Sequence, residues 1–196
     1  MRTAWGYDTD HIEPLLSVED FNAMTGGVHS GNTDRVKTAL EAASQAIRNY
    51  CGWHISPSLD CTAYPMGGER LIKLHANYVS DVRSVVEDGV ELTSGQYEWR
   101  FDGLLRRACF KNWSGRWNSI EVEYTAGYDI AAVPDLAEAV RAITEGVLAV
   151  SAGVMSESAD GVSISYSANA SSIAAALTPS YKSALAIYKV VNSYGA

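Results

Sequence analysis

The stretch from Ser119 to Ala139 reads Ser-Ile-Glu-Val-Glu-Tyr-Thr-Ala-Gly-Tyr-Asp-Ile-Ala-Ala-Val-Pro-Asp-Leu-Ala-Glu-Ala. Its first half alternates apolar Ile, Val and Tyr with Glu and Thr, and this period of two indicates a strand with one buried face. Gly127 ends that strand, and Pro134 suits the first turn of a helix because its missing N–H costs nothing there. Asp135 places negative charge near the positive end of the helix dipole. The stretch therefore predicts a strand, a turn and a helix in succession.

Two helices are expected before the strands and two after them. Ser17, with Asp20 three residues later, resembles a capping box and starts a short helix that stops at Gly26-Gly27. The other three helices are expected from about residue 33 to Gly52, from Pro134 to about residue 150, and from Thr178-Pro179 onward. In the last of these, apolar residues surround most of the circumference, which predicts burial on more than one side, with a second subunit as one candidate for the second side.

The middle of the chain predicts strands. Short apolar runs bounded by turn residues span 59–64, 71–75, 82–86, 90–92, 96–101, 104–110 and 120–125. Asp88-Gly89 and Asp102-Gly103 are typical hairpin turns. We expect one small antiparallel β-meander closed by 120–125. The predicted fold class is α+β, mainly helical, with residues 1–16 as an extended N-terminal arm and 17–196 as a single domain.

The segment between the last two helices, Ser151–Ser172, is rich in Ser, Ala and Gly and long for a connection inside a compact domain. Val162, Ile164 and Tyr166 alternate within it and predict an extra strand in this long loop. That strand could form a hairpin or edge within the chain, or it could pair with the sheet edge of another chain.

Composition narrows the classes of function. The chain has 196 residues, is 47% hydrophobic and 19% charged, and carries a formal net charge of −8. These values indicate an ordinary globular protein and argue against a general nucleic-acid binder, which normally carries a basic surface. An acidic surface would also suit the wall of a channel through which DNA slides, since like charges repel. No apolar run approaches the roughly 20 residues that span a bilayer, so no membrane partner is expected.

No motif for catalysis, metal or cofactor binding is found. The four histidines are scattered without metal-ligand spacing, and the three cysteines form no Cys-x-x-Cys pair. The expectation is therefore no catalytic residue, no metal and no cofactor, although a hydrolase site assembled from distant residues remains an alternative. A helix-turn-helix built from the first two helices is disfavoured, because the loop from Met24 to Thr33 is too long for that turn.

One basic–aromatic cluster has two interpretations. It contains Arg106, Arg107, Lys111 and Arg116, interleaved with Trp113 and Trp117, with no acidic residue between Leu104 and Asn118. It could contact DNA phosphate or, as we favour, an acidic partner protein. Alternatively, it is a solvated hairpin whose long side chains cover the tryptophans. In the final helix, Leu185, Tyr188 and Val191 would carry the packing if that helix docks on a neighbouring subunit.

The order of these elements resembles the head–tail connector (adaptor, or head-completion) proteins of tailed bacteriophages. The resemblance rests on Tyr-Thr-Ala-Gly-Tyr at 124–128, Val-Pro-Asp-Leu at 133–136, the strand–Asp-Gly–strand pattern at 82–92 and Gly-Val-Ser-Ile-Ser-Tyr at 161–166. It covers about residues 17–194 and is one of order and spacing more than of identity.

The resemblance implies a structural ring subunit of the virion neck and not an enzyme. Such a ring, expected to be a dodecamer, would dock beneath the portal protein, extend the DNA channel without specific DNA binding, and offer a platform to the next neck or tail protein. The chain would be made in the cytoplasm of the host bacterium. The nearest rival is another structural neck or tail protein, such as a tail-completion or tail-terminator subunit.

Overall fold

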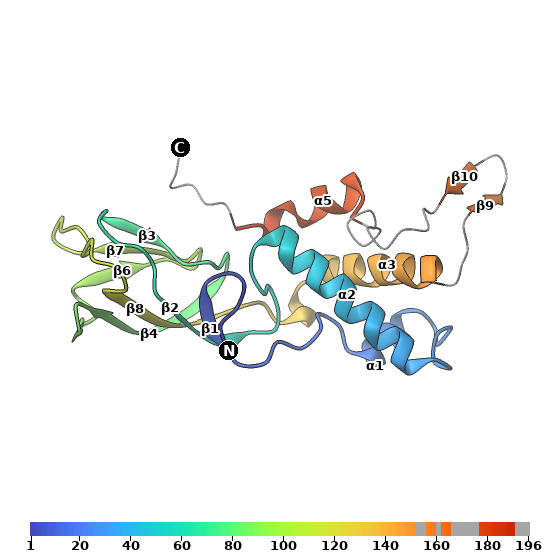
Figure 1. Cartoon of the computed structure of the whole chain (residues 1–196), viewed down its shortest axis with the longest axis horizontal. Helices are drawn as coiled ribbons and strands as arrows, with labels where there is room; N and C mark the ends of the chain where they lie inside the picture. The colour runs from blue at the N-terminus through green and yellow to red at the C-terminus, as the bar shows by residue number, and fades with distance from the viewer. Residues whose placement is uncertain (152–155, 160–161, 166–176, 191–196) are drawn as a thin grey trace. The chain divides into compact units, whose positions relative to one another are not determined.

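The computed structural model in Figure 1 describes residues 1–151, 156–159, 162–165 and 177–190. The chain divides into two compact units. Unit 1 contains the described residues of 1–13, 51–129 and 188–190, and unit 2 contains those of 14–50 and 130–187. The expectation of a single domain over 17–196 stays a prediction.

Unit 1 contains a five-stranded antiparallel sheet in the order β1-β2-β8-β4-β5. The strands are β1 (Tyr7–Thr9), β2 (Leu59–Ala63), β8 (Ile120–Ala126), β4 (Val79–Glu87) and β5 (Val90–Glu91). The central strand is β8, which pairs with β2 on one side and with β4 on the other. Ile120, Val122, Tyr124 and Ala126 are buried, and the residues between them are half-buried. The alternation that opened the sequence therefore predicts this strand correctly.

A second sheet in unit 1 has the order β3-β7-β6, formed by β3 (Leu71–Lys73), β7 (Leu104–Arg107) and β6 (Tyr97–Trp99). The expected single meander is therefore wrong. The two hairpins at Asp88-Gly89 and Asp102-Gly103 form as predicted, but they belong to different sheets. The other pairings join strands far apart in sequence, and local alternation carries no information about such partners.

The first thirteen residues belong to unit 1. Tyr7–Thr9 form β1 and pair with β2, while the terminal amino group of Met1 donates to the Thr9 carbonyl at 2.6 Å. Tyr7 is buried, and its hydroxyl lies 2.8 Å from His54 Nδ1. The stretch expected as an extended arm thus contains an edge strand of the five-stranded sheet.

An aromatic cluster packs around the turn that follows β8. The Tyr128 ring stacks on Tyr78 at 4.7 Å and meets Trp53 and Tyr188 edge-on at 5.9 and 5.6 Å. Trp53 Nε1 donates to the Tyr188 carbonyl at 2.7 Å. Gly127 has φ +115°, and the Pro57 carbonyl and the His54 ring lie so close that no side chain fits there. The Ala-Gly-Tyr sequence therefore ends the central strand and begins this cluster.

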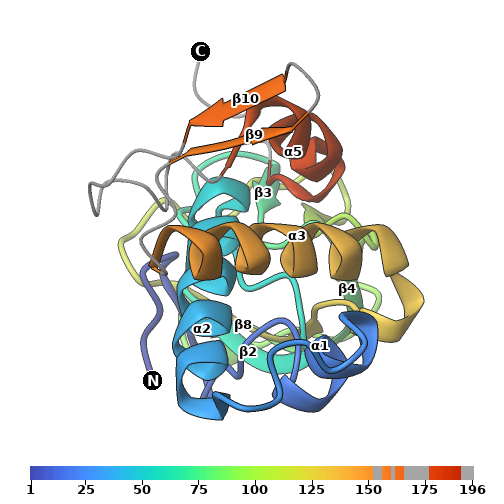
Figure 2. The ribbon, with the colours of Figure 1, turned by 90° about the vertical axis from the view of Figure 1, so that its right-hand side faces the viewer.

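Unit 2 is built from helices. They are α1 (Val18–Met24), α2 (Thr33–Cys51), α3 (Pro134–Ser151) and α5 (Pro179–Leu185), with 3-10 turns η1 (Ile130–Ala132) and η2 (Ala186–Tyr188). Figures 1 and 2 both show α3 running across α2, with α1 near the N-terminal end of α2. The Arg35 guanidinium on α2 donates to the Leu148 carbonyl on α3 at 2.7 Å, and the Tyr50 hydroxyl donates to the Lys182 carbonyl on α5 at 3.0 Å.

The helix starts expected from the sequence are confirmed. Ser17 Oγ accepts from the Asp20 N–H at 3.0 Å, Thr178 caps α5 with Pro179 in its first turn, and α3 begins at Pro134. The last helix is shorter than expected, since regular α-helix ends at Leu185 and continues as η2 to Tyr188.

The described part of the long loop contains a small antiparallel hairpin of β9 (Ser156–Ala159) and β10 (Val162–Ser165). Val162 and Ile164 lie in β10, while Tyr166 is outside the described residues. The α+β class is confirmed, whereas the description "mainly helical" is not, because unit 1 consists largely of sheet.

Candidate interaction surface

The structure separates the basic–aromatic cluster into a buried part and an exposed part. Arg107 is buried in unit 1, where its guanidinium pairs with Glu87 on β4 at 2.9 Å and donates to the Gln96 carbonyl at 2.6 Å. The guanidinium carbon also lies 5.6 Å from the centre of the Trp113 ring, which is 2% exposed. Arg107 and Trp113 therefore pack inside this unit, with the guanidinium over the Trp113 ring but not in solvent.

The Arg107–Glu87 pair also anchors the loop Cys109–Ser119, which we call the distal loop. The other carboxylate oxygen of Glu87 accepts the Ser114 N–H at 2.7 Å. The backbone N–H of Trp113 donates to the Glu69 carbonyl at 2.9 Å, and the Trp113 carbonyl accepts from the Gly68 N–H at 3.1 Å. These bonds hold the middle of the distal loop against the chain before β3.

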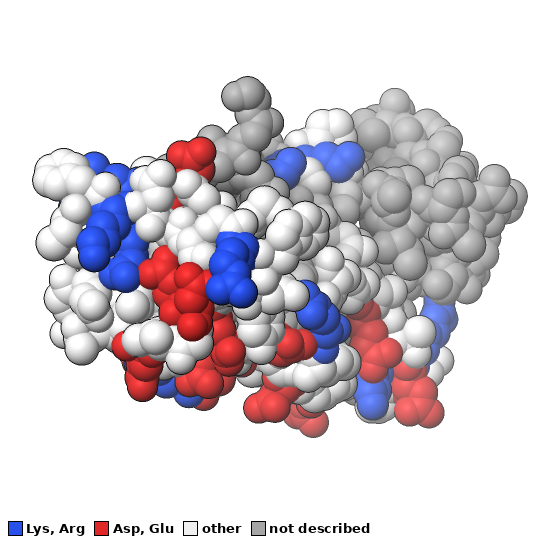
Figure 3. Space-filling model, turned by 60° about the vertical axis from the view of Figure 1, so that its left-hand side comes forward, with Lys and Arg blue, Asp and Glu red and all other residues white. Residues whose placement is uncertain are grey.

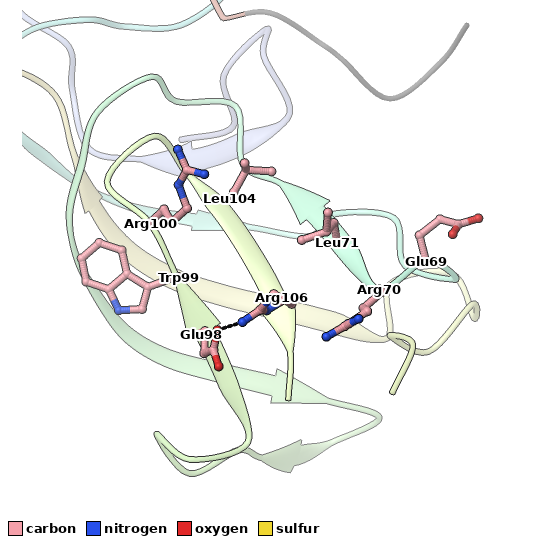
Figure 4. A pocket seen from close by; sticks show the side chains of 8 residues that line it. All are labelled: Glu69, Arg70, Leu71, Glu98, Trp99, Arg100, Leu104 and Arg106. Atoms are coloured by element: carbon pink, nitrogen blue, oxygen red, sulfur yellow. Dashed lines mark hydrogen bonds and ion pairs between the residues drawn. The ribbon is translucent and has the colours of Figure 1, made fainter. Parts of the chain in front are cut away.

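The exposed part of the cluster carries acidic partners that lie elsewhere in sequence. Arg106 pairs with Glu98 across the β6–β7 hairpin (Figure 4), and Arg116 pairs with Asp88 at 3.5 Å. The absence of acids between residues 104 and 118 therefore overstated the positive charge of this surface. The Asp102-Gly103 turn was the available signal, because a hairpin closed there places Glu98 directly opposite Arg106.

The outer face of the three-stranded sheet is an open depression of about 900 Å³. Figure 4 shows Trp99, Arg100 and Arg106 around Leu71 and Leu104, with Arg70 and Glu69 at the side of β3. Guanidinium groups beside carboxylates and short apolar side chains suit contact with another macromolecule. No nucleophile with an adjacent general base lines this depression.

Two aromatic rings of the distal loop project into solvent. Phe110 is 82% and Trp117 is 86% exposed. The backbone of Cys109 and Phe110 has φ +54° and +58°, and the Arg70 guanidinium lies 4.4 Å from the centre of the Phe110 ring. Sequence reasoning singled out Trp117 but missed Phe110, and a lone Phe after a strand offers no signal that its ring stays outside.

The predicted residues of the last helix are largely inside the chain. Leu185 is 1% and Tyr188 is 4% exposed, while Val191 lies outside the described residues. Ile187 is the apolar residue between them that points to solvent, with 65% exposure. Leu185 and Ile187 belong to unit 2, whereas Tyr188 belongs to unit 1, where it packs in the aromatic cluster around Tyr128.

Charge is distributed unevenly over the surface. Figure 3 shows groups of Lys and Arg atoms and groups of Asp and Glu atoms as separate patches on the visible face. Among the residues that the structure describes, no three His, Cys, Asp or Glu side chains are grouped as metal ligands. Within the same part of the chain, none of the helices combines the length and the apolar character that crossing a bilayer requires.

Comparison with solved structures shows where this fold occurs. A chain from the "Neck of empty GTA particle computed with C6 symmetry" matches with a TM-score of 0.57 and 19% identity, covering 96% of this chain and 98% of that chain. A chain from the "Virion of native gene transfer agent (GTA) particle" matches with a TM-score of 0.58 and 16% identity, covering 97% and 98%. A third, from the "Neck of native GTA particle computed with C12 symmetry", has a TM-score of 0.56, 15% identity and coverages of 95% and 99%. At these identities the likeness is one of fold.

Comparison by sequence gives the family. No curated protein matches the chain. The model of the head completion protein family matches residues 14–190, which include nearly all of both units. The chain belongs to the head completion protein family.

Proposed function

We propose that this head completion protein forms a ring of twelve subunits beneath the portal protein of a phage-like particle. As a structural subunit of the neck, it joins the head to the tail. The ring would extend the DNA channel and present its far side to the next neck or tail protein. The observation that carries the proposal is the family match over residues 14–190.

The fold supports the same conclusion. The chain aligns over nearly its full length with chains from neck and virion structures of gene transfer agent particles, two of them computed with C6 or C12 symmetry. A shared fold with a subunit of a symmetric neck favours a ring, since cyclic assemblies reuse one interface in every subunit.

The interfaces of the ring belong to the proposal. We propose that Val162, Ile164 and Tyr166 add a strand to a neighbouring chain, and that the last helix contributes Leu185, Tyr188 and Val191. Because Leu185 and Tyr188 are already buried, the exposed Ile187 between them is the better candidate for direct contact. Arg106, Arg116 and Trp117 would add a contact from unit 1, with Arg107 and Trp113 holding them in place.

The same proposal covers catalysis, DNA passage and localisation. The chain acts without catalysis, metal or cofactor, and DNA passes through the ring without specific binding, as the net charge of −8 favours. It is made in the cytoplasm of the host bacterium and resides in the virion.

The test is complementation of particles assembled without this protein. DNA-filled heads and tails should stay separate, and the purified protein should join them. Capture should occur on heads that carry the portal and not on isolated tail tubes. Capture by tail tubes alone would favour a tail-completion or tail-terminator subunit instead.

A further inference from the structure

We infer that the distal loop of one subunit docks on the acidic outer face of the five-stranded sheet of a second copy of this chain. The inference rests on the proposed ring and names two surfaces that join neighbouring subunits. Both surfaces belong to unit 1, so the argument uses contacts within that unit alone.

The outer face of the five-stranded sheet is acidic. The register places on this face the residues that alternate with the buried ones: Asp8, Asp60, Asp81, Glu91, Glu121 and Glu123, with Thr62, Ser84 and Thr125 between them. The basic side chain on this face is Arg83, which already pairs with Asp60. Hydrogen bonds from Thr125 and Arg83 hold the pKa of the Asp60 carboxyl below its usual range, so that carboxylate stays charged.

The distal loop has the opposite character. It carries Lys111 and Arg116, of which Arg116 lies 3.5 Å from Asp88 with its guanidinium still largely exposed, and Phe110 and Trp117 expose their rings beside them. Tryptophan and arginine are the residues most enriched among the contacts that dominate protein interfaces. The carboxylates of this face can accept the cations, and the half-buried Val86, which the register places between Glu121 and Glu91, offers an apolar contact to a ring.

The backbone of the loop supports a binding role. Cys109 and Phe110 are consecutive non-glycine residues in the left-handed region, at φ +54° and +58°. Such conformations persist where surrounding contacts impose them, and they cluster at binding sites. Here the contacts are the bonds of Trp113 and Ser114 to Glu69 and Glu87, which hold the loop while two of its rings remain in solvent.

A second copy is the occupant that fits both surfaces. A contact between two unlike patches of the same chain is head-to-tail, and repetition of such a contact closes a ring when the rotation between copies is a whole fraction of a turn. Copies that each carry a net charge of −8 repel one another unless a cationic patch meets an acidic one. The loop and the outer face of the sheet provide these two patches on every subunit.

Two variants test the contact. The loop variant carries Lys111→Glu and Arg116→Glu, and the face variant carries Asp81→Lys and Glu123→Lys. A control variant with Lys37→Glu, Thr38→Asp and Gln45→Glu makes the same change in net charge on exposed positions of α2 as the loop variant makes in unit 1. Tryptophan fluorescence checks the fold of unit 1 in each variant, and light scattering after size exclusion measures assembly over a concentration series.

Each of the first two variants alone should stay monomeric, while the wild-type chain and the control variant form rings. An equal mixture of the two variants should form rings in which the two kinds of copy alternate, because the native loop meets the native face and the reversed loop meets the reversed face. A chain that carries all four substitutions should regain ring formation. A mixture that stays monomeric, or a loop variant that forms normal rings, would overturn the inference.

Removal of one aromatic side chain supplies an independent test. Trp117→Ala should raise the concentration needed for half assembly by about tenfold, since anchors of this kind contribute a tenfold or larger factor in affinity. Phe101→Ala removes a ring that is also largely exposed, at the opposite end of β7, and should leave assembly unchanged. Equal effects of the two substitutions would contradict the inference.

Different outcomes refute the proposed place in the neck and the proposed contact of the distal loop. If rings form through the loop but portal-bearing heads do not capture them, the contact stands and the proposed place in the neck falls. If loop variants form rings but are not captured by heads, the loop binds the portal and the inference falls. A wild-type chain that remains monomeric at every concentration tested, yet completes heads, also overturns the inference.

Discussion

The substitution Gly127→Ala should destabilise unit 1 far more than alanine at other left-handed glycines. Gly127 has φ +115°, outside the small left-handed region that residues with a side chain adopt. A Cβ built there would lie 2.3 Å from the Pro57 carbonyl oxygen and 2.8 Å from His54 Nε2. Both atoms must move, and His54 Nε2 is bonded to the Ala126 carbonyl at 2.9 Å inside the unit.

The magnitude follows from these contacts. The backbone conformation costs a residue with a side chain about 1–2 kcal/mol. Displacing the His54 ring from the Ala126 carbonyl leaves buried polar groups without a partner, which costs about 1–3 kcal/mol. Together these effects predict a loss of about 2–5 kcal/mol in the free energy of unfolding, which is large for one added methyl group.

Gly89 provides the matched control. It occupies the second position of the Asp88-Gly89 turn with φ +78°, and no heavy atom lies within 4 Å of a Cβ built there. Gly89→Ala therefore carries the conformational cost without the close contacts. Its expected loss is about 1 kcal/mol, the cost of the left-handed conformation alone.

Urea unfolding followed by tryptophan fluorescence measures both variants. The five tryptophans, Trp5, Trp53, Trp99, Trp113 and Trp117, all lie in unit 1, so the signal reports on that unit. With a slope of about 2 kcal/mol per molar urea, the two midpoints should differ by about 0.5–2 M. Equal losses for the two variants would refute the argument that close approach at Gly127 holds the turn.

Three further predictions concern other contacts. Arg107→Ala should lower the free energy of unfolding of unit 1 by about 3–5 kcal/mol, because it removes one partner of an ion pair whose side chains are largely buried. Arg106→Ala, whose partner Glu98 is exposed, should cost less than about 1 kcal/mol in the same urea titration. Similar losses for the two variants would contradict the assignment of buried and exposed pairs. Ser17→Ala removes the cap of α1 and should cost about 1 kcal/mol in unit 2, measured by circular dichroism, while an unchanged midpoint would show that the cap is not needed. Burial raises the pKa of Cys51 to about 12 and of Cys61 to about 11 from the 9.0 of a free thiol. A thiol reagent below pH 9.0 should therefore modify only the exposed Cys109 in the folded chain. In urea the same reagent should modify all three cysteines. Since folding raises both values, their contribution to stability is complete below pH 9.0 and is lost as the pH rises through about 11 and 12; stability that rises over this window would contradict their burial.

The local structure was largely predictable. The caps at Ser17 and Thr178, the helix start at Pro134 and the two Asp-Gly turns depend on residues within one turn of chain, so short sequence patterns contain the whole interaction. The alternation of Ile120, Val122 and Tyr124 likewise predicted which face of β8 is buried.

The division of the strands into two sheets was not predictable in this way. β8 pairs with β2 and β4, and β3 pairs with β7, across long stretches of sequence. Any strand with one apolar face can pair with several others, and the choice is made by packing between the two sheets. We expected each strand to pair with the next one along the chain, and that assumption wrongly predicted a single meander.

The candidate surface shows the same limit. The sequence pattern placed Trp117 and Arg116, which lie in an exposed loop, in one candidate contact surface with Arg107 and Trp113, which are buried. Glu87 lies about twenty residues before Arg107, and only the approach of β4 to β7 makes the two a buried pair. The acidic outer face of the five-stranded sheet was hidden for the same reason, because its carboxylates come from five strands that meet only after folding.

The sequence by itself determined the helices, their caps, the hairpin turns and the strand that ends at Gly127, because each depends on atoms a few residues apart. It also carried the order of elements that marks the head completion family. Only the tertiary structure decided which strands share a sheet, which arginines are buried, and which aromatic rings of the distal loop remain in solvent. Those outcomes depend on contacts between distant segments, whose free energies are set by burial and pairing after the chain has folded.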